Sequence, residues 1–458
     1  MYIRLLQKDN FVVLWQPFLG SRKFFRRNNF LGGKKLKKRG LGLLLAGMLF
    51  VTGLAGCGNA GGNQASGNQT SESRTSEAAG GQEGEAGTEV ENGTQVAEET
   101  EAPVEKAPNI NVDMEDMNAM DVVNNMRIGW NIGNTLDSTS DRLTRVDMAF
   151  KFETAWGNPK VTQELIDAVL DAGFNVIRVP VSWTNHMAGE PDYLITESWM
   201  DRVQEVVDYA YNKGAYVILN LHHEDWNYPY YDNEEAACAR MKAVWSQIAE
   251  RFQDYDEHLI FEGQNEPRKI GTSVEWTGGD QEGWDVVNAT NKAFVEAIRN
   301  AGGSNPYRIL MIPGYGANST VGIKHIELPE NDDRIVVSVH AYEPYDFALN
   351  TAGRSEWNED TAAIDTLMKT LKELYIDKGT PVIIGEFGAM NKDNESDRAA
   401  WAEYYVKAAA EIGIPCVWWD NGLFEGDGER FGLFDRHTYE CKYPQLMEAL
   451  MRGTDVTN

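Results

Sequence analysis

Eight short runs of apolar, mostly β-branched residues recur along residues 113–458, and amphipathic helical stretches separate most of them. Runs that are apolar along their whole length are typical of parallel strands covered on both faces, and a closing glycine is typical of the helices between them. Eight such units in one order favour a closed (β/α)8 barrel, the TIM barrel, over an open doubly wound sheet. The expected strands lie at residues 127–133, 175–181, 216–223, 259–266, 308–314, 335–342, 381–388 and 415–422.

The first 57 residues are expected to form an export signal and to take no part in the fold. Five Lys and Arg residues at 34–39 precede an apolar stretch at 41–54, which is short for a membrane span. Residues 54–57, Leu-Ala-Gly-Cys, resemble the bacterial lipobox, which predicts a lipoprotein signal with lipidation of Cys57. An ordinary secretory signal is the alternative. The long basic region also suggests a start codon downstream of Met1.

Residues 58–112 are expected to be a disordered acidic linker. The segment is rich in Gly, Ser and Glu and contains no aromatic residue, so it cannot bury enough apolar surface to offset its ordering entropy. After residue 57 the chain carries 31 basic and 69 acidic residues, a net charge of −38. This charge argues against a nucleic-acid partner and leaves a neutral polymer such as a glycan open.

Cys238, Cys416 and Cys441 are the three cysteines of residues 113–458. An odd number is no disulfide framework, and the spacings are not those of a zinc site. We expect small buried apolar residues, with a Cys416–Cys441 bridge as the alternative. The chain also contains no Rossmann glycine fingerprint and no P-loop, so no nucleotide cofactor is expected.

Polar and aromatic side chains stand at the C-terminal ends of the expected strands, where a barrel of this kind carries its site. Glu266 and Glu386 each close an apolar run and are followed at once by chain-turning residues. A carboxylate beside a buried run is costly unless something uses or satisfies it, so two of them suggest acid/base and nucleophilic chemistry. The other strand-end candidates are Asn131, Asn134, Arg178, His222, His223, Asn265, His340, Tyr342, Trp419 and Asp420.

Seven strings in this order and strand phase resemble glycoside hydrolase family 5, a clan A cellulase family, and most of all its subfamily 4: GNTLD, RVPVSW, LHHE, FEGQNEP, SVHAY, GEFG and WWDNG. The resemblance covers about residues 113–453. It implies a retaining endo-β-1,4-glucanase that cuts cellulose, mixed-linkage β-glucan or xyloglucan and needs no catalytic metal or other cofactor. A β-mannanase, xylanase or exo-glucosidase on the same barrel remains open. Two alternatives without catalysis fit the sequence less well. A surface lipoprotein that binds glycan without cutting it should have lost a catalytic carboxylate, whereas both are present here. A solute-binding lipoprotein should have two open-sheet lobes, which eight strand–helix units in one order do not suit.

The resemblance assigns Glu266 as the acid/base and Glu386 as the nucleophile, with their carboxyl groups about 5 Å apart. We expect Glu266 to hold a proton near neutral pH and Glu386 to be ionised. Arg178 matches the arginine that bonds to the nucleophile. Glu262 has the same strand parity as Glu266 and competes for the role of acid. Because it lies deeper, we expect it to be a barrel-layer residue paired with Arg178 or a histidine.

Two further matches and one strand neighbour concern residues close to the reaction. Asn265 matches the asparagine that binds the sugar 2-hydroxyl, and Tyr342 matches a tyrosine that contacts the nucleophile. His340 should share a strand face with Tyr342, because side chains two residues apart point the same way.

His222 and His223 are expected to bind sugar hydroxyls, and neighbouring residues in a strand point to opposite sides. With Glu224 they would suggest a metal site, but such a site needs three or four convergent ligands. Asn134 and Asp137 match positions that bind sugar or support the first loop.

Nine aromatic residues follow strand ends or lie in loops, and the C–H faces of sugars stack on such rings. Together they predict an extended cleft with several subsites, and the resemblance of WWDNG to the family motif implies that Trp419 lies beneath the sugar at the cleaved bond. With the lipid at Cys57, we expect a monomeric extracellular enzyme anchored at the outer face of the cell membrane, with a β-glucan as its partner. The nine are Trp183, Trp226, Tyr228, Tyr230, Tyr231, Trp276, Trp284, Tyr345 and Trp419.

Overall fold

The computed structural model describes residues 2–6, 11–15, 113–143 and 149–456. Cys57 and the expected linker at 58–112 lie outside the described residues, as does most of the expected signal. Within that signal, β1 (Tyr2–Leu6) pairs antiparallel with β2 (Phe11–Trp15) in a separate two-stranded sheet, where no strand was expected.

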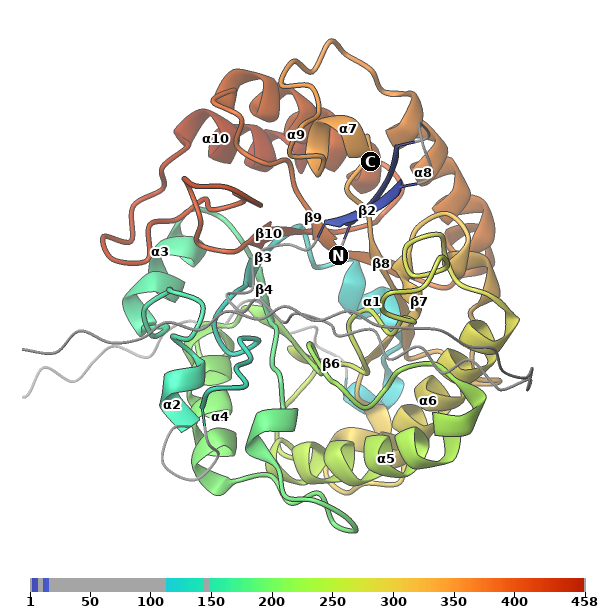
Figure 1. The fold of residues 1–458 in the computed structure, drawn as a ribbon. Coiled ribbons are helices and arrows are strands. Elements are labelled where there is room, and N and C mark those ends of the chain that lie inside the picture. Colours follow the sequence, from blue (N-terminus) through green and yellow to red (C-terminus); the bar gives the residue numbers. More distant parts are fainter. Residues whose placement is uncertain (1, 7–10, 16–112, 144–148, 457–458) are drawn as a thin grey trace, which may run out of the picture. The chain divides into compact units, whose positions relative to one another are not determined.

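Eight parallel strands close into a barrel, which confirms the predicted TIM-barrel architecture (Figure 1). The chain passes round the barrel in sequence order, and the last strand pairs with the first. Each strand overlaps one of the expected runs, but seven of them end one to four residues before the run does, so that the residues after them lie outside the strands. The strands are β3 (Ile128–Ile132), β4 (Val176–Val179), β5 (Tyr216–Asn220), β6 (Leu259–Glu262), β7 (Leu310–Asn318), β8 (Ile335–His340), β9 (Val382–Phe387) and β10 (Cys416–Asp420).

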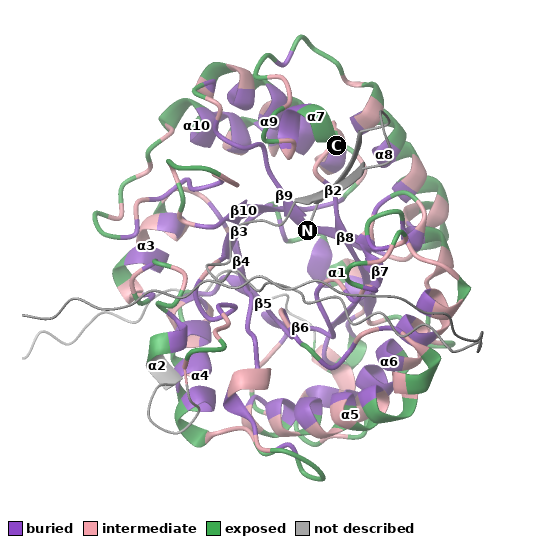
Figure 2. Cartoon of the chain, viewed as in Figure 1, coloured by how far each residue is buried: buried purple, intermediate pink, exposed green. Residues whose placement is uncertain are grey.

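Helices follow most strands and pack their apolar faces against the outside of the barrel (Figure 2). Side chains cap several of them: Thr162 accepts from the N–H of Leu165, and Asp280 accepts from that of Gly283. The helices are α1 (Ala119–Val123), α2 (Ala149–Phe152), α3 (Gln163–Asp171), α4 (Glu197–Tyr211), α5 (Glu234–Arg251), α6 (Gln281–Arg299), α7 (Tyr345–Ala348), α8 (Ala362–Leu374), α9 (Glu395–Ala410) and α10 (Pro444–Gly453). Short 3-10 turns lie at η1 (Met114–Asp116), η2 (Thr184–His186), η3 (Tyr231–Asn233), η4 (Asn305–Tyr307), η5 (Gly322–His325) and η6 (Ile376–Lys378).

The strands are buried on both faces, which explains why their sequences are apolar throughout. One set of strand residues packs outward against the helices, and the alternate set fills the barrel interior. Val122 and Val123 of α1 belong to the interior cluster, together with Ile218 and Ile260, so α1 packs against the interior side chains. Among the described residues, no helix is both long enough and apolar enough to span a membrane.

The interior changes from apolar to polar towards the C-terminal ends of the strands. On β4 the inward residues are Val176 and then Arg178, and on β5 they are Ile218 and then Asn220. Because every second residue of a strand points into the barrel, the inward side chains form an apolar layer first and a polar layer next to it, nearer the C-terminal ends of the strands. The functional site is built on this layer.

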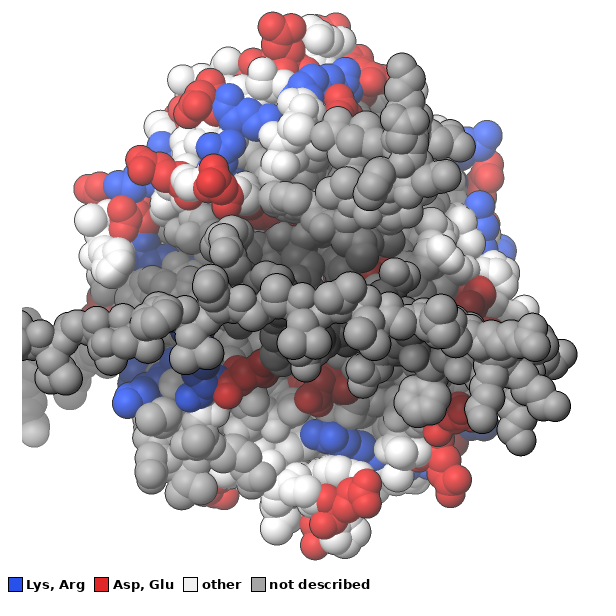
Figure 3. Space-filling view, viewed as in Figure 1, with Lys and Arg blue, Asp and Glu red and all other residues white. Residues whose placement is uncertain are grey.

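The three cysteines of the barrel are free, so the alternative of a Cys416–Cys441 bridge is wrong. Cys416 is buried, as expected of a small apolar residue, whereas Cys238 and Cys441 are half-buried. On the face drawn in Figure 3, described Lys and Arg side chains are interspersed with Asp and Glu.

Candidate active site

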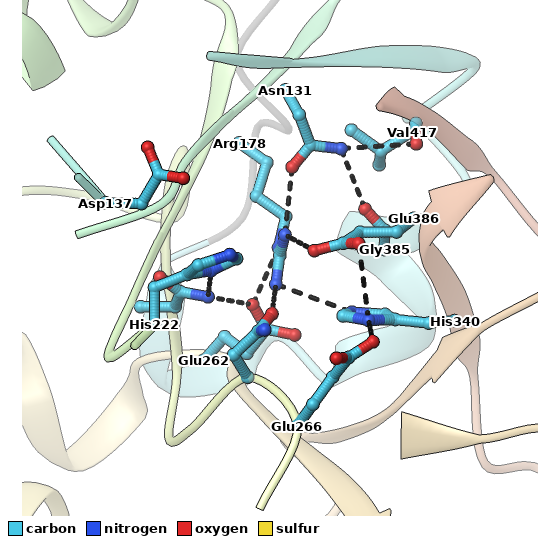
Figure 4. A network of polar contacts seen from close by, with 12 residues as sticks. Asn131, Asp137, Arg178, His222, Glu262, Glu266, His340, Gly385, Glu386 and Val417 are labelled. Carbon is cyan, nitrogen blue, oxygen red and sulfur yellow. Dashed lines mark hydrogen bonds and ion pairs between the residues drawn. The ribbon is translucent and has the colours of Figure 1, made fainter. Parts of the chain in front are cut away.

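Glu266 and Glu386 lie close together at the C-terminal end of the barrel (Figure 4). Glu386 is on β9, and Glu266 follows the end of β6 by four residues. An oxygen of each carboxyl group and a ring nitrogen of His340 all lie within 4.8 Å of one another. Retaining glycosidases hold their two carboxyl groups about 5 Å apart, whereas inverting enzymes need roughly 6.5–9.5 Å. The two carboxyl groups therefore approach as closely as the expected retaining pair requires.

A local irregularity of β9 brings Glu386 into this position. The inward residue Ile383 would place Gly385, and not Glu386, in the barrel by simple alternation. The register between β8 and β9 shifts just before His340, which pairs with Glu386. The side-chain amide of Asn131 donates to the carbonyl of Gly385 at 2.9 Å and thereby holds this bend.

Arg178 links the nucleophile candidate to the polar layer beneath it. Its Nη1 lies 2.8 Å from Glu386 Oε1, and its Nε lies 2.7 Å from Glu262 Oε2. Nη2 donates to Asn265 Oδ1 at 2.7 Å, and Nη1 also donates to Asn131 Oδ1 at 2.9 Å. Burial lowers the pKa of Arg178, but Glu262 and Glu386 outweigh it and raise the pKa above its usual value. Both predicted partners of Arg178 are confirmed.

Glu262 is fully buried and occupied by structural contacts. Besides Arg178, it accepts from Ser338 Oγ at 2.6 Å and from Asn220 Nδ2 at 3.1 Å. These contacts confirm that Glu262 is a barrel-layer residue and remove it as a competitor for the acid.

Tyr342 donates its hydroxyl to Glu386 Oε2 at 3.0 Å, so the predicted contact with the nucleophile candidate is confirmed. Burial and then the charge of Glu386 raise the pKa of Tyr342 well above its usual value, and the hydroxyl therefore keeps its proton. His340 Nδ1 lies 2.9 Å from Glu266 Oε1 and 3.6 Å from Glu386 Oε2, between the two carboxyl groups.

The proton distribution differs from the one expected from the sequence. Burial raises the pKa of Glu266, but the hydrogen bond and charge of His340, with the charge of Arg268, outweigh it and lower the pKa to about 2. Burial raises the pKa of Glu386, and the charges of His340 and Arg178 offset this only in part. The expectation that Glu266 is the carboxyl with the higher pKa is therefore wrong. Burial lowers the pKa of His340, but the charges of Glu386 and Glu266 outweigh it and raise the pKa above its usual value.

His222 and His223 follow the end of β5, so the alternation that points neighbouring strand residues to opposite sides does not apply to them. Their rings contact each other with centroids 4.5 Å apart, because regular alternation stops where the strand ends. His222 also lies parallel to Trp419, with ring centroids 5.7 Å apart. Ligand atoms of Asp137, His222 and His223 lie within 4.8 Å of one another, which makes this one of three groups among the described residues that could hold a metal ion.

Glu224 does not join that group, although it is next to His223 in the sequence. Its carboxylate accepts from the Trp183 backbone N–H, from Trp226 Nε1 and from the Thr184 hydroxyl, and so it braces the loop. A metal site made of His222, His223 and Glu224, the alternative raised by the His-His-Glu sequence, is therefore wrong, because Glu224 does not converge with the two histidines.

Asn134 and Asp137 shape the loop after β3. Asn134 has a positive φ of 57°, and its N–H donates to Asp137 Oδ2 at 3.0 Å. Burial raises the pKa of Asp137 to about 6, against the lowering effect of hydrogen bonds from the Thr135 and Asn134 N–H groups. Asp137 thus supports the first loop, one of the two roles expected for it.

The nine aromatic candidates differ widely in exposure. Trp183 is fully buried and donates to the carbonyl of Asn220, so its assignment to a sugar-binding cleft is wrong, and Trp226 is also buried. Trp419 packs against Met390 and Phe431 and is 7% exposed. Three of the nine are exposed: Tyr231, Trp276 and Tyr345.

Two contributors escaped the sequence analysis. Arg268 follows the acid candidate by two residues, and its Nη1 lies 3.3 Å from Glu266 Oε2. Ser338, on β8, donates its hydroxyl to Glu262. Parity with His340 could have identified Ser338, but the loop position of Arg268 gave no comparable signal.

The chain matches the family model described as Cellulase (glycosyl hydrolase family 5) over residues 140–425. Endoglucanase B of Neocallimastix patriciarum is 51% identical over 343 residues, which cover 74% of this chain and 72% of that protein.

Solved structures of endoglucanases are also similar to this chain. A GH5-4 broad specificity endoglucanase from Ruminococcus champanellensis with bound cellotriose aligns with a TM-score of 0.72 and 45% identity, over 74% of this chain and all of that one. A GH5 xyloglucan-specific endo-β-1,4-glucanase from a metagenomic library, in complex with cellotriose, aligns with a TM-score of 0.70 and 43% identity, over 72% and 98% of the two chains.

Replacing Tyr342 by Phe should lower kcat/KM about 10- to 100-fold, because it removes one hydrogen bond to a charged group. The lost bond favoured ionised Glu386, so the pKa of Glu386 should rise and the acidic limb of the pH profile should move to higher pH. Tyr307→Phe, at the opposite end of the barrel, is the control. An acidic limb that stays in place for Tyr342→Phe would show that this bond does not control Glu386.

Proposed function

Because the chain belongs to glycosyl hydrolase family 5, we propose that the protein is an endo-1,4-β-glucanase that hydrolyses internal bonds with retention of anomeric configuration. The observation that carries the proposal is the close approach of Glu266 and Glu386, whose nearest oxygens lie within 4.8 Å. That distance leaves room for one sugar carbon and its leaving oxygen, but not for a water molecule beside the second carboxylate.

In the first step, a Glu386 oxygen attacks the anomeric carbon and the bond from this carbon to the glycosidic oxygen breaks. Glu266 protonates that oxygen, so the leaving sugar departs as an alcohol. Arg178 and Tyr342 each occupy one oxygen of Glu386, and both contacts favour the ionised carboxylate that must attack.

The acid draws its proton from the pair that it forms with His340. The ring holds the proton 2.9 Å from Glu266 Oε1, so one transfer along this hydrogen bond converts Glu266 into the carboxylic acid. Arrival of a neutral sugar excludes water and leaves the buried charges of His340 and Glu266 less well solvated, which favours the neutral pair.

In the second step, Glu266 removes a proton from water, and the water oxygen attacks the anomeric carbon. The bond to Glu386 breaks, and Glu386 leaves as a carboxylate. Two inversions at one carbon restore the original configuration.

The remaining site residues bind the sugar in this proposal. Asn265 Oδ1 accepts from Arg178, which turns its amide nitrogen towards the position of the 2-hydroxyl. Trp419 supplies an apolar ring face, and His222, His223 and Asn134 meet hydroxyl groups near it.

We assign the substrate class as β-1,4-linked glucans, including mixed-linkage glucan and xyloglucan. Support comes from the printed descriptions of two similar structures, one a broad specificity endoglucanase and the other xyloglucan-specific.

Replacing either carboxylate by Ala should lower kcat on a β-glucan about 10³-fold or more, and the two roles can be told apart with azide. In Glu386→Ala, azide should enter from the face that the nucleophile vacates and give the α-glycosyl azide. In Glu266→Ala, azide should intercept the glycosyl enzyme and give the β-glycosyl azide. Glu403→Gln, on the surface of α9, should keep normal activity. If Glu386→Ala gave the β-azide and Glu266→Ala the α-azide, the assignment of nucleophile and acid/base would have to be exchanged.

We also propose that the protein is a lipoprotein held outside the cell membrane by a lipid on Cys57, with the 58–112 segment as its tether. The lipobox-like Leu-Ala-Gly-Cys string and the acidic, aromatic-free composition of the segment support this. Cys57→Ala should move the enzyme from the membrane fraction to the medium. Retention of Cys57→Ala on the membrane would contradict lipid anchoring.

A further inference from the structure

Arg268 is the basic side chain that contacts the acid candidate from the loop of Glu266 itself. It donates through Nη1 to the Glu266 carbonyl at 3.0 Å and lies 3.3 Å from Glu266 Oε2. His340 contacts the other oxygen, Oε1. The two oxygens of the acid candidate therefore face different cations.

Two neighbours on the same loop hold the guanidinium of Arg268. Its Nε faces Glu275 Oε1 at 3.6 Å, and its Cζ lies 4.2 Å from the centre of the Trp276 ring. Glu275 is itself fixed, because its other oxygen accepts from the Gly271 N–H at 2.7 Å. The indole of Trp276 covers the flat face of the guanidinium.

The loop that carries these residues is anchored at the residue that follows Arg268. The backbone N–H of Lys269 donates to the Tyr315 hydroxyl at 2.8 Å, and Lys269 Nζ lies 2.6 Å from Asp280 Oδ1, next to α6. These contacts leave Arg268 little freedom to move away from Glu266.

The positive charge of Arg268 is only partly neutralised by its neighbours. Glu275 is 2% exposed, and at 3.6 Å it makes an ion pair with Arg268 but no hydrogen bond. A partner at that distance neutralises the guanidinium only in part, so the rest of its field acts on Glu266.

We propose that Arg268 is a positioning residue that sets how readily the acid/base Glu266 holds its proton. Glu275 and Trp276 in turn set how strongly the positive charge of Arg268 acts on Glu266. This inference rests on the proposed function of Glu266. A positive charge close to Glu266 favours loss of the proton that Glu266 shares with His340, and Glu275 moderates this effect by partial neutralisation. The titratable or charged groups that face Glu266 are His340 and Tyr342 from β8 and its loop, Glu386 from β9, His223 after β5, and Arg268 with Glu275 on its own loop.

Substitutions of the two charges should shift the pH profile in opposite directions. Arg268→Gln removes the positive charge, so the shared proton should be retained longer and the alkaline limb of kcat/KM should move up by about one pH unit. Glu275→Gln leaves Arg268 without its counter-charge, so the same limb should move down. Arg268→Lys keeps the charge and should restore most of the wild-type limb.

The experiment measures kcat/KM against pH on a soluble β-glucan for the full chain and these three variants. Arg334→Gln, at the N-terminal end of β8, changes the net charge equally and should leave the limb in place. Thermal unfolding and circular dichroism show which variants are folded, and the downward shift of Glu275→Gln provides the reading if Arg268→Gln does not fold.

The outcomes separate the inference from the function on which it rests. A wild-type chain that releases no sugar from β-glucan would overturn the proposed function. An active wild type whose alkaline limb is the same in Arg268→Gln and Glu275→Gln, or moves the same way in both, would overturn the role of Arg268 alone. Opposite shifts, with rescue by Lys, are the result that supports it.

Discussion

The site depends on one buried cation. Arg178 has no exposed surface, and its guanidinium reaches Glu262 below, Glu386 above and the amides of Asn131 and Asn265 at the sides. A buried guanidinium needs anionic partners, and removing one partner of such a pair typically costs about 3–5 kcal/mol. Stability of the polar layer and orientation of Glu386 therefore rest on the same contacts. These contacts hold Glu386 where one of its oxygens lies within 4.8 Å of an oxygen of Glu266.

Charge balance around Arg178 explains how the two carboxyl groups can take different roles. Glu262, Glu266 and Glu386 surround two basic side chains, Arg178 and His340. Arg178 cannot give up its proton, whereas His340 can, and it lies between Glu266 and Glu386. In the proposed mechanism, the proton that the leaving group needs resides on His340, which does not react, one hydrogen bond away from Glu266, which does. Arg268 and Glu275 extend this arrangement along the loop after β6.

The barrel and the pairing of Arg178 with Glu262 could be predicted from strand order and strand parity. The contact of Arg178 with Glu386 and the close approach of Glu266 and Glu386 could be predicted only from the resemblance of the strand-end motifs to glycoside hydrolase family 5. Strand parity predicts less where the strands stop. His222 and His223 fall beyond the end of β5, so alternation no longer governs them. Trp183 packs inward because its indole N–H finds the carbonyl of Asn220, a partner that no spacing in the sequence shows. The proton order of the two acids depends on where His340 Nδ1 points, and the register shift that brings His340 beside Glu386 is likewise invisible in the sequence.

The central claim is that Arg178 and its neighbours hold two carboxyl groups close enough for direct attack on the sugar. The most direct measurement is proton NMR of the first sugars released from a soluble β-glucan, recorded before mutarotation mixes the anomers. The structure predicts that the new reducing ends appear first as the β-anomer, because a covalent intermediate on Glu386 inverts the carbon once and water inverts it again. Initial release of the α-anomer would mean that water attacks directly, and would contradict the account.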